Sequence, residues 1–135
     1  MSLVNGKYVN VGEEGFKEFM ISQGAPEDFM QRMKYEKRIE EFKLEGNKLT
    51  KSHIVEGDAD KSRTTEIILG QEYEEQMGPR KVKNLATLDG NVLKITSIKD
   101  DRTTPITRIY TFSKDGLVIV HKSGKGEGKL MFKRL

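Results

Sequence analysis

Short stretches of alternating apolar and polar residues, separated by glycine-containing turns, fill the chain from Arg38 to its end. Phe42 and Leu44 alternate with charged neighbours, and Gly46-Asn47 then marks a hairpin turn. Asp89-Gly90 marks another hairpin turn between two such stretches. The stretches recur about every ten residues with no helical pattern between them, which argues against a parallel sheet. The pattern predicts an all-β fold, a single antiparallel up-and-down barrel.

Two short helical patterns follow the first strand. Phe16, Phe19 and Met20 have the i, i+3, i+4 spacing of an amphipathic helix, and the segment from Phe29 to Met33 carries a second pattern. They predict a helix-turn-helix that packs against the barrel and lacks the basic recognition face of a DNA-binding motif.

The expected strands cover Gly6 to Val11, the stretch from Arg38 to the Gly46 turn, Lys48 to Val55, Arg63 to Leu69, a short stretch before the Met77-Gly-Pro79 turn, Arg80 to Leu88, Val92 to Lys99, Thr103 to Phe112, Leu117 to Lys122 and Lys129 to Leu135. Gly124, Gly126 and Gly128 are expected in a loose loop.

The composition limits the class of protein. The 135 residues suffice for one domain with a sizeable core, and we expect a single domain over 1–135. With no cysteine and two histidines, we expect no disulfide, metal site or cofactor, and a reducing, cytoplasmic location. The sequence has no secretory-signal pattern and no apolar run of membrane-spanning length. A net charge of +3 and the absence of tryptophan give no stacking platform for nucleic acid, so we expect no nucleic-acid partner.

Several motifs follow one another in a characteristic order. Gly70-Gln-Glu-Tyr-Glu-Glu is followed by Arg80-Lys-Val-Lys and then by Leu88-Asp-Gly, and Gly6-Lys-Tyr and Gly15-Phe-Lys stand near the start of the chain. These motifs resemble those of the intracellular lipid-binding proteins, the cytosolic fatty-acid-binding family. The resemblance covers essentially the whole chain. It implies a ten-stranded, clam-shaped barrel capped by a helix-turn-helix, with an internal ligand cavity, in a monomeric, non-enzymatic carrier of a long-chain fatty acid or a related small hydrophobic ligand.

Arg108 is the main candidate for a ligand anchor. It shares one face of its strand with Ile106, Tyr110 and Phe112, and a charge buried there without a partner would be costly. One interpretation is an outward Arg108 whose stem lies over apolar surface. The other is an inward Arg108 that binds a ligand carboxylate, and the resemblance favours it. A different alignment of the following turn places Tyr110 at the family's arginine position instead.

The last strand departs from the resemblance. Many family members carry an inward Arg-x-Tyr there, whereas this chain has Leu130-Met-Phe132. A carboxylate would then depend on Arg108, together with Tyr110, His121 or water. The change leaves open a bulkier or less acidic lipid, such as a retinoid, a bile acid or a sterol. A protein-interaction scaffold that carries lipid only incidentally is a further alternative.

The expected ligand-binding residues come from the strands and from the first helix. His121 fits a hydrogen-bonded wall position better than a catalytic one, and we expect no catalytic residue. Glu72 and Arg80 either lie near the cavity or form a cross-strand surface pair. Arg32, Lys34, Lys37 and Arg38 form either a solvated face or a surface for transient contact with anionic membranes. The expected ligand-binding residues are Arg108, Tyr110, His121, Phe132, Leu130, Ile119, Phe16, Met20 and Arg80.

Overall fold

A computed structural model gives the fold of this chain. The structure describes residues 3–22, 27–28, 37–57, 62–77, 80–99, 106–124 and 126–135. Side chains at positions 76, 77, 80, 81, 98 and 99 lie outside this description.

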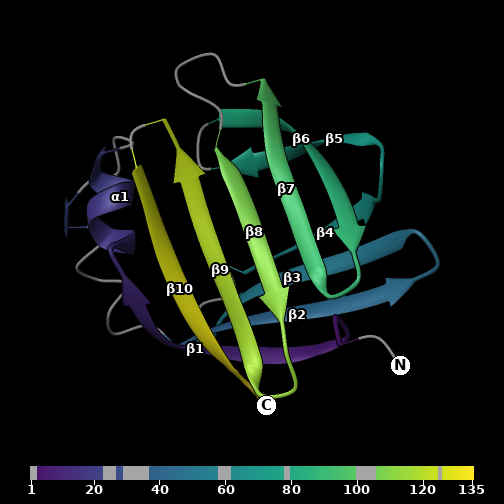
Figure 1. Ribbon diagram of the computed structural model, residues 1–135, viewed down its shortest axis with the longest axis horizontal. Coiled ribbons are helices and arrows are strands. Elements are labelled where there is room, and N and C mark those ends of the chain that lie inside the picture. Colours follow the sequence, from purple (N-terminus) through teal and green to yellow (C-terminus); the bar gives the residue numbers. More distant parts are fainter. Residues whose placement is uncertain are drawn as a thin grey trace.

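Ten antiparallel strands form one sheet that curls into a nearly closed barrel (Figure 1). The strand order is β4-β3-β2-β1-β10-β9-β8-β7-β6-β5, so strands that are neighbours in sequence pair with each other, except β4 and β5, and the first strand pairs with the last. β4 and β5 are the two edges of the sheet and are not hydrogen-bonded to each other. The elements are β1 (Gly6–Glu14), α1 (Phe16–Ser22), β2 (Arg38–Glu45), β3 (Lys48–Val55), β4 (Arg63–Ile68), β5 (Glu72–Met77), β6 (Arg80–Asp89), β7 (Val92–Lys99), β8 (Thr107–Phe112), β9 (Gly116–Ser123) and β10 (Gly126–Arg134).

The structure confirms the predicted barrel and the first predicted helix. The turn at Gly90 has the expected geometry, because its φ of 63° lies in the left-handed region that favours glycine. The expected second helix, from Phe29 to Met33, lies outside the described residues, although Glu27 and Asp28 just before it are helical. The first part of the expected strand at Thr103 lies outside them as well.

Gly124 lies in a turn, but the prediction that Gly126 and Gly128 belong to a loose loop was wrong. β10 already begins at Gly126, which pairs with Ser123, and Gly128 pairs with His121. Gly128 has a packing reason to lack a side chain. A Cβ there would lie 2.6 Å from the Cα of Phe16, where α1 begins. Gly126 and Gly128 therefore belong to a paired strand, and Gly128 lets the helix approach it closely.

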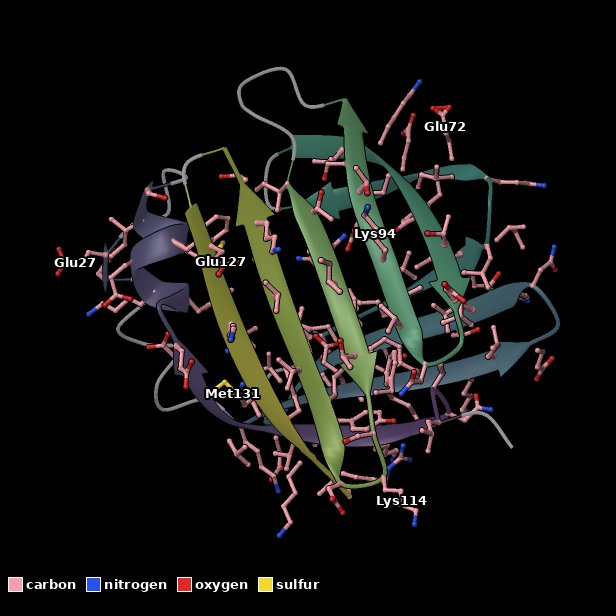
Figure 2. All side chains as sticks on the ribbon, viewed as in Figure 1. Glu27, Glu72, Lys94, Lys114, Glu127 and Met131 are labelled. Carbon is pink, nitrogen blue, oxygen red and sulfur yellow. The ribbon has the colours of Figure 1, made fainter. Side chains whose placement is uncertain are left out.

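Strand alternation separates an inner from an outer wall. On β8, Arg108, Tyr110 and Phe112 are buried, while the residues between them are more exposed. Lys94 and Glu72 lie on the outside of the barrel in Figure 2. The inner wall carries a continuous apolar cluster, so the period-two pattern of the sequence does select the buried face. The buried members of this cluster are Val4, Tyr8, Phe16, Phe42, Leu49, Ile67, Ala86, Leu93, Ile95, Tyr110, Phe112, Leu117, Ile119, Leu130 and Phe132.

The junction between β1 and α1 is fixed by two polar side chains. Glu13 accepts hydrogen bonds from the backbone N–H of Phe16 at 2.7 Å and of Lys17 at 3.4 Å, which satisfies donors at the helix start. Asn10 donates to the carbonyls of Gly12 and Met131, both at 3.2 Å. The pairing register of β1 with β10 shifts between Asn10 and Gly12, so Asn10 supports an irregularity in the strand. No described helix is long and apolar enough to cross a bilayer.

Candidate ligand-binding site

Arg108 lies in an inner row that runs across five strands. It is 7% exposed and stands opposite His121 of β9 on one side and Ile95 of β7 on the other. Ala86 of β6 and Gly128 of β10 extend this row at its two ends. The inward orientation predicted for Arg108 is therefore present, and the outward alternative is wrong.

A parallel inner row beside Arg108 is apolar apart from one hydroxyl. Leu130, Ile119, Tyr110 and Leu93 pair in turn across β10, β9, β8 and β7, and none is more than 6% exposed. Phe132, Leu117 and Phe112 form the next row. One wall of the barrel thus places a single guanidinium beside a broad hydrocarbon surface.

Arg108 has a partner that sequence reasoning missed. Its Nη2 donates to Oε1 of Glu75 on β5 at 2.8 Å, and the two side chains are only 9% and 11% exposed. The same Glu75 oxygen accepts from Asn84 Nδ2 at 2.8 Å, and Asn84 Oδ1 accepts from Ser97 at 3.0 Å. Arg108 Nη1 reaches the Tyr110 hydroxyl at 3.4 Å. The guanidinium is thus held in a buried network of charge-assisted bonds.

A second charged group lies on β2 and β3. Lys51 is 8% exposed, and its Nζ lies 6.0 Å from the centroid of the Tyr110 ring. Glu40 is 7% exposed, and its Oε1 lies 3.2 Å from Nδ1 of His53. Glu40 stands opposite His53 and Phe42 stands opposite Lys51, so Lys51 and Glu40 are diagonal neighbours on the inner face. We call Arg108, Glu75, Lys51 and Glu40 the polar centre.

The members of the polar centre keep each other ionised. Burial acts to raise the pKa of Glu75, but Arg108 and Lys51 outweigh it and hold that pKa below its usual value. For Glu40, burial is again opposed, here by Lys51, His53 and Arg108, and the pKa is lowered. Burial acts to lower the pKa of Lys51, but Tyr110, Glu40 and Glu75 raise it above the usual lysine value. The polar centre therefore contains two cations and two carboxylates at neutral pH.

His121 lies in the same inner row, between Arg108 and Gly128, and contacts α1. Its ring meets that of Phe16 edge-on, with centroids 5.0 Å apart. Burial, followed by the nearby positive charges of Arg108, Lys51 and Arg38, lowers the pKa of His121 to about 3. The imidazole is therefore neutral at pH 7 and adds no charge to the inner wall of the barrel.

Among the described residues, Glu40 Oε2, the Tyr73 hydroxyl and His121 Nδ1 are buried polar atoms without a hydrogen-bond partner. Burial is the main reason that the pKa of Tyr73 is raised to about 12, so its hydroxyl stays protonated and can donate. Native proteins seldom leave buried polar atoms unsatisfied. Such atoms suit a bound polar group, either a ligand head or water.

The structure brings most of the expected ligand-binding residues to the inner wall. Arg108, Tyr110, Ile119, Leu130, Phe132 and Phe16 are buried, His121 is partly buried, and Met20 packs against the core cluster from α1. Arg80 begins β6, but its side chain lies outside the described residues.

Glu72 lies on the surface, as one of its two interpretations predicted, but it forms no pair with Arg80. It is exposed, lies opposite Leu85 rather than Arg80, and points to the outside of the barrel (Figure 2). The inward acid of β5 is Glu75, three residues later. Strand β5 reads Glu-Tyr-Glu-Glu-Gln-Met, and Tyr73 and Met77 share the period-two face that contains Glu75, so this phase was the signal that could have placed Glu75 rather than Glu72 on the inner face.

A cleft of about 430 Å³ opens between the unpaired edges β4 and β5. It is lined by Arg63, Thr64, Thr65 and Glu66 on one side and by Glu74 and Glu75 on the other. Since Glu75 also binds Arg108, this cleft reaches the polar centre through the same carboxylate. Elsewhere in the described residues, no three His, Asp or Glu side chains are arranged to hold a metal ion.

Comparison with known proteins gives relatives in both sequence and structure. The chain is 38% identical over 96 residues to the liver fatty acid-binding protein of Mus musculus, which covers 70% of this chain and 73% of the relative. It is 33% identical over 105 residues to fatty acid binding protein 1-B.1 of Danio rerio, which covers 77% of each. The fold matches a Schistosoma mansoni fatty acid binding protein, solved in complex with arachidonic acid, at a TM-score of 0.87 and 20% identity over 100% of this chain and 98% of that one. No family model matches the sequence.

Proposed function

Because this chain belongs to the fatty-acid-binding protein family, we propose that it is a non-enzymatic carrier of a long-chain fatty acid held inside the barrel. The observation that carries the proposal is the inner wall of β7 to β10, where one buried guanidinium stands beside two apolar rows. An amphiphile with one polar end and a long hydrocarbon chain matches that surface.

The energetics favour a ligand with a long tail. Each methylene transferred from water to the apolar rows contributes about 0.8 kcal/mol. The head group then lies at the polar centre, whose two cations are Arg108 and Lys51, close to Tyr110. The tail lies along His121, Ile119, Leu130, Phe132, Phe16 and Met20. The relatives carry the name of fatty-acid-binding proteins, which favours a fatty acid over a retinoid, a bile acid, a sterol or a scaffold role.

The proposal extends to how the carrier works in the cell. We expect a cytoplasmic monomer that delivers its ligand by transient contact with anionic membranes. Of the basic edge predicted from the sequence, Lys37 is exposed and pairs with Glu56 at 3.2 Å, an ion pair open to solvent. Arg32 and Lys34 lie outside the described residues. Transfer that speeds up with the anionic lipid content of acceptor vesicles and slows in high salt would support this contact.

The binding proposal is tested directly by the lipid that the protein retains. The protein is purified without added lipid, extracted, and its ligands are identified by mass spectrometry. Oleate is then titrated against a bound fluorescent lipid. We expect long-chain fatty acids in the extract and stoichiometric displacement by oleate. An extract free of lipid, together with no displacement by any long-chain compound, would overturn the proposal.

A further inference from the structure

The two cations of the polar centre differ in how far they are already satisfied. Arg108 holds Glu75 at 2.8 Å, and that carboxylate is fixed in turn by Asn84. Lys51 has no ion pair within 4.0 Å and no hydrogen bond among the described residues, although it is 8% exposed. A ligand that approached Arg108 would have to displace a bound protein carboxylate. The ammonium of Lys51 offers its donors without such competition.

An acceptor lies beside this free donor. Glu40 Oε2 is buried and has no hydrogen-bond partner among the described residues, while Oε1 faces His53. Glu40 and Lys51 sit diagonally across β2 and β3 on the inner face. The pair therefore presents one open acceptor and an ammonium with open donors to the interior. A head group that carries both an acceptor and a donor would satisfy the two together.

We propose that Lys51 and Glu40 form the head-group site, and that a fatty acid binds there with one proton shared between its carboxyl group and Glu40. One ligand oxygen accepts from the Lys51 ammonium. The other forms an O–H···O bond with Glu40 Oε2, whose proton comes from solvent. This inference deepens the proposed function and depends on it. A primary fatty amide has the same acceptor and donor, so it fits the site without taking up a proton.

Charge balance explains why a proton accompanies the ligand. The two cations of the polar centre already face two carboxylates, and His121 is neutral. A third carboxylate would leave the interior with excess negative charge in a region of low dielectric constant. Two carboxylates that share one site hold a proton between them, because both cannot ionise at short range.

Other titratable groups face Glu40 and could compete for that proton. His53 on β3 is the nearest, and Tyr8 stands opposite Glu40 on β1. Arg108 and Tyr110 on β8, Glu75 and Tyr73 on β5, and His121 on β9 face the same interior. Tyr73 is protonated throughout the neutral range, and Glu75 is paired with Arg108. His53 is therefore the alternative proton acceptor that an experiment must separate from Glu40.

Calorimetry in buffers of different ionisation enthalpy counts the protons taken up on binding. For the parent protein at pH 7.5 we expect uptake of about one proton with oleate and none with oleamide. Glu40→Gln should abolish the uptake and bind oleate at least as tightly, because its amide N–H can donate to the carboxylate. His53→Gln should retain the uptake. Loss of uptake in His53→Gln, with retention in Glu40→Gln, would overturn the assignment to Glu40.

Displacement titrations test the Lys51 half of the site. Lys51→Met should weaken both oleate and oleamide by about ten- to a hundredfold, the range of a hydrogen bond to a charged group. The control, Lys94→Met, removes a charge from the outer wall and should change neither affinity. The single variant Lys51→Met leaves the Glu40 charge buried and could misfold for that reason. The double variant Lys51→Met/Glu40→Gln buries no lone charge and serves as the control for this effect. Oleate binding that survives unchanged in both overturns the inference, whereas failure of the parent to bind any long-chain compound overturns the carrier function itself.

Discussion

Two arginines on the same wall of the barrel, Arg108 on β8 and Arg134 on β10, find their hydrogen-bond partners in different ways. In the polar centre, Arg108 is almost fully buried and is neutralised by Glu75. At the far end of β10, Arg134 contacts no carboxylate among the described residues. Its donors reach the carbonyls of Leu3, Asn5 and Ser113 and the hydroxyl of Tyr8, at distances of 2.6–3.3 Å.

The surroundings of the two arginines differ in the same sense. Arg134 closes the barrel over an aromatic cluster of Tyr8, Phe42 and Phe112, whose ring centroids lie 5.0–6.0 Å apart. Arg108 lies among charges and polar atoms, some of which have no partner in the described structure. The side-chain donors around Arg134 have protein partners, whereas some buried polar atoms near Arg108 have none among the described residues. The comparison teaches that a buried polar site is identified by its unsatisfied atoms rather than by its charge alone.

Breaking the Arg108–Glu75 pair should have the largest effect. Arg108→Met leaves the Glu75 carboxylate buried without its cation, so we expect a loss of about 3–5 kcal/mol in the free energy of unfolding. Urea denaturation measures it. The double variant Arg108→Met/Glu75→Gln should recover most of the loss, because no lone charge is left. A loss in the double variant as large as in the single one would contradict the ion-pair explanation.

Ile106, Tyr110 and Phe112 place Arg108 on the apolar face of an alternating strand, and the resemblance to fatty-acid-binding proteins then favoured the inward orientation over the outward one. The phase argument was also available for Lys51. It lies two residues after Leu49 and four before Val55, both buried, so period two places it on the inner wall. The alternation was hard to recognise in the sequence because the neighbours Thr50, Ser52 and His53 are polar as well. The pairing of Arg108 with Glu75 could not be predicted, because it joins strands that are distant in the sheet.

Lowering the pH should destabilise the folded protein through His121, which lies in the same inner row as Arg108. The imidazole titrates near 6.5 in the unfolded chain, and its pKa in the folded protein is about 3. Between these values the unfolded state binds more protons, so stability falls as the pH is lowered. We expect the histidine to contribute a loss of at most about 1.4 kcal/mol per pH unit below 6.5. Glu40 and Glu75, whose pKa values are lowered, add to the loss only at more acidic pH.

Urea denaturation of the parent and of His121→Gln between pH 7 and pH 4.5 separates this contribution. The variant should lose less stability over that interval, whatever its stability at pH 7. Exposed Lys94→Met should follow the slope of the parent. Parallel pH profiles for parent and His121→Gln would show that the imidazole is not held neutral by the fold.

The smallest effect is expected at the closed end. Arg134→Met removes the hydrogen bonds to the N-terminal segment and the stacking of the guanidinium on Tyr8, whose ring centroid lies 4.8 Å away. Because Arg134 is partly exposed, water replaces some of these bonds, and we expect a loss of about 1–2 kcal/mol. Hydrogen exchange should rise at residues 3–8 and leave the strands around Arg108 unchanged. Arg134→Lys keeps the charge but not the planar set of donors, so it should restore little of the loss. Full restoration by lysine would mean that charge, rather than the geometry of the bonds to Leu3 and Asn5, holds this end closed.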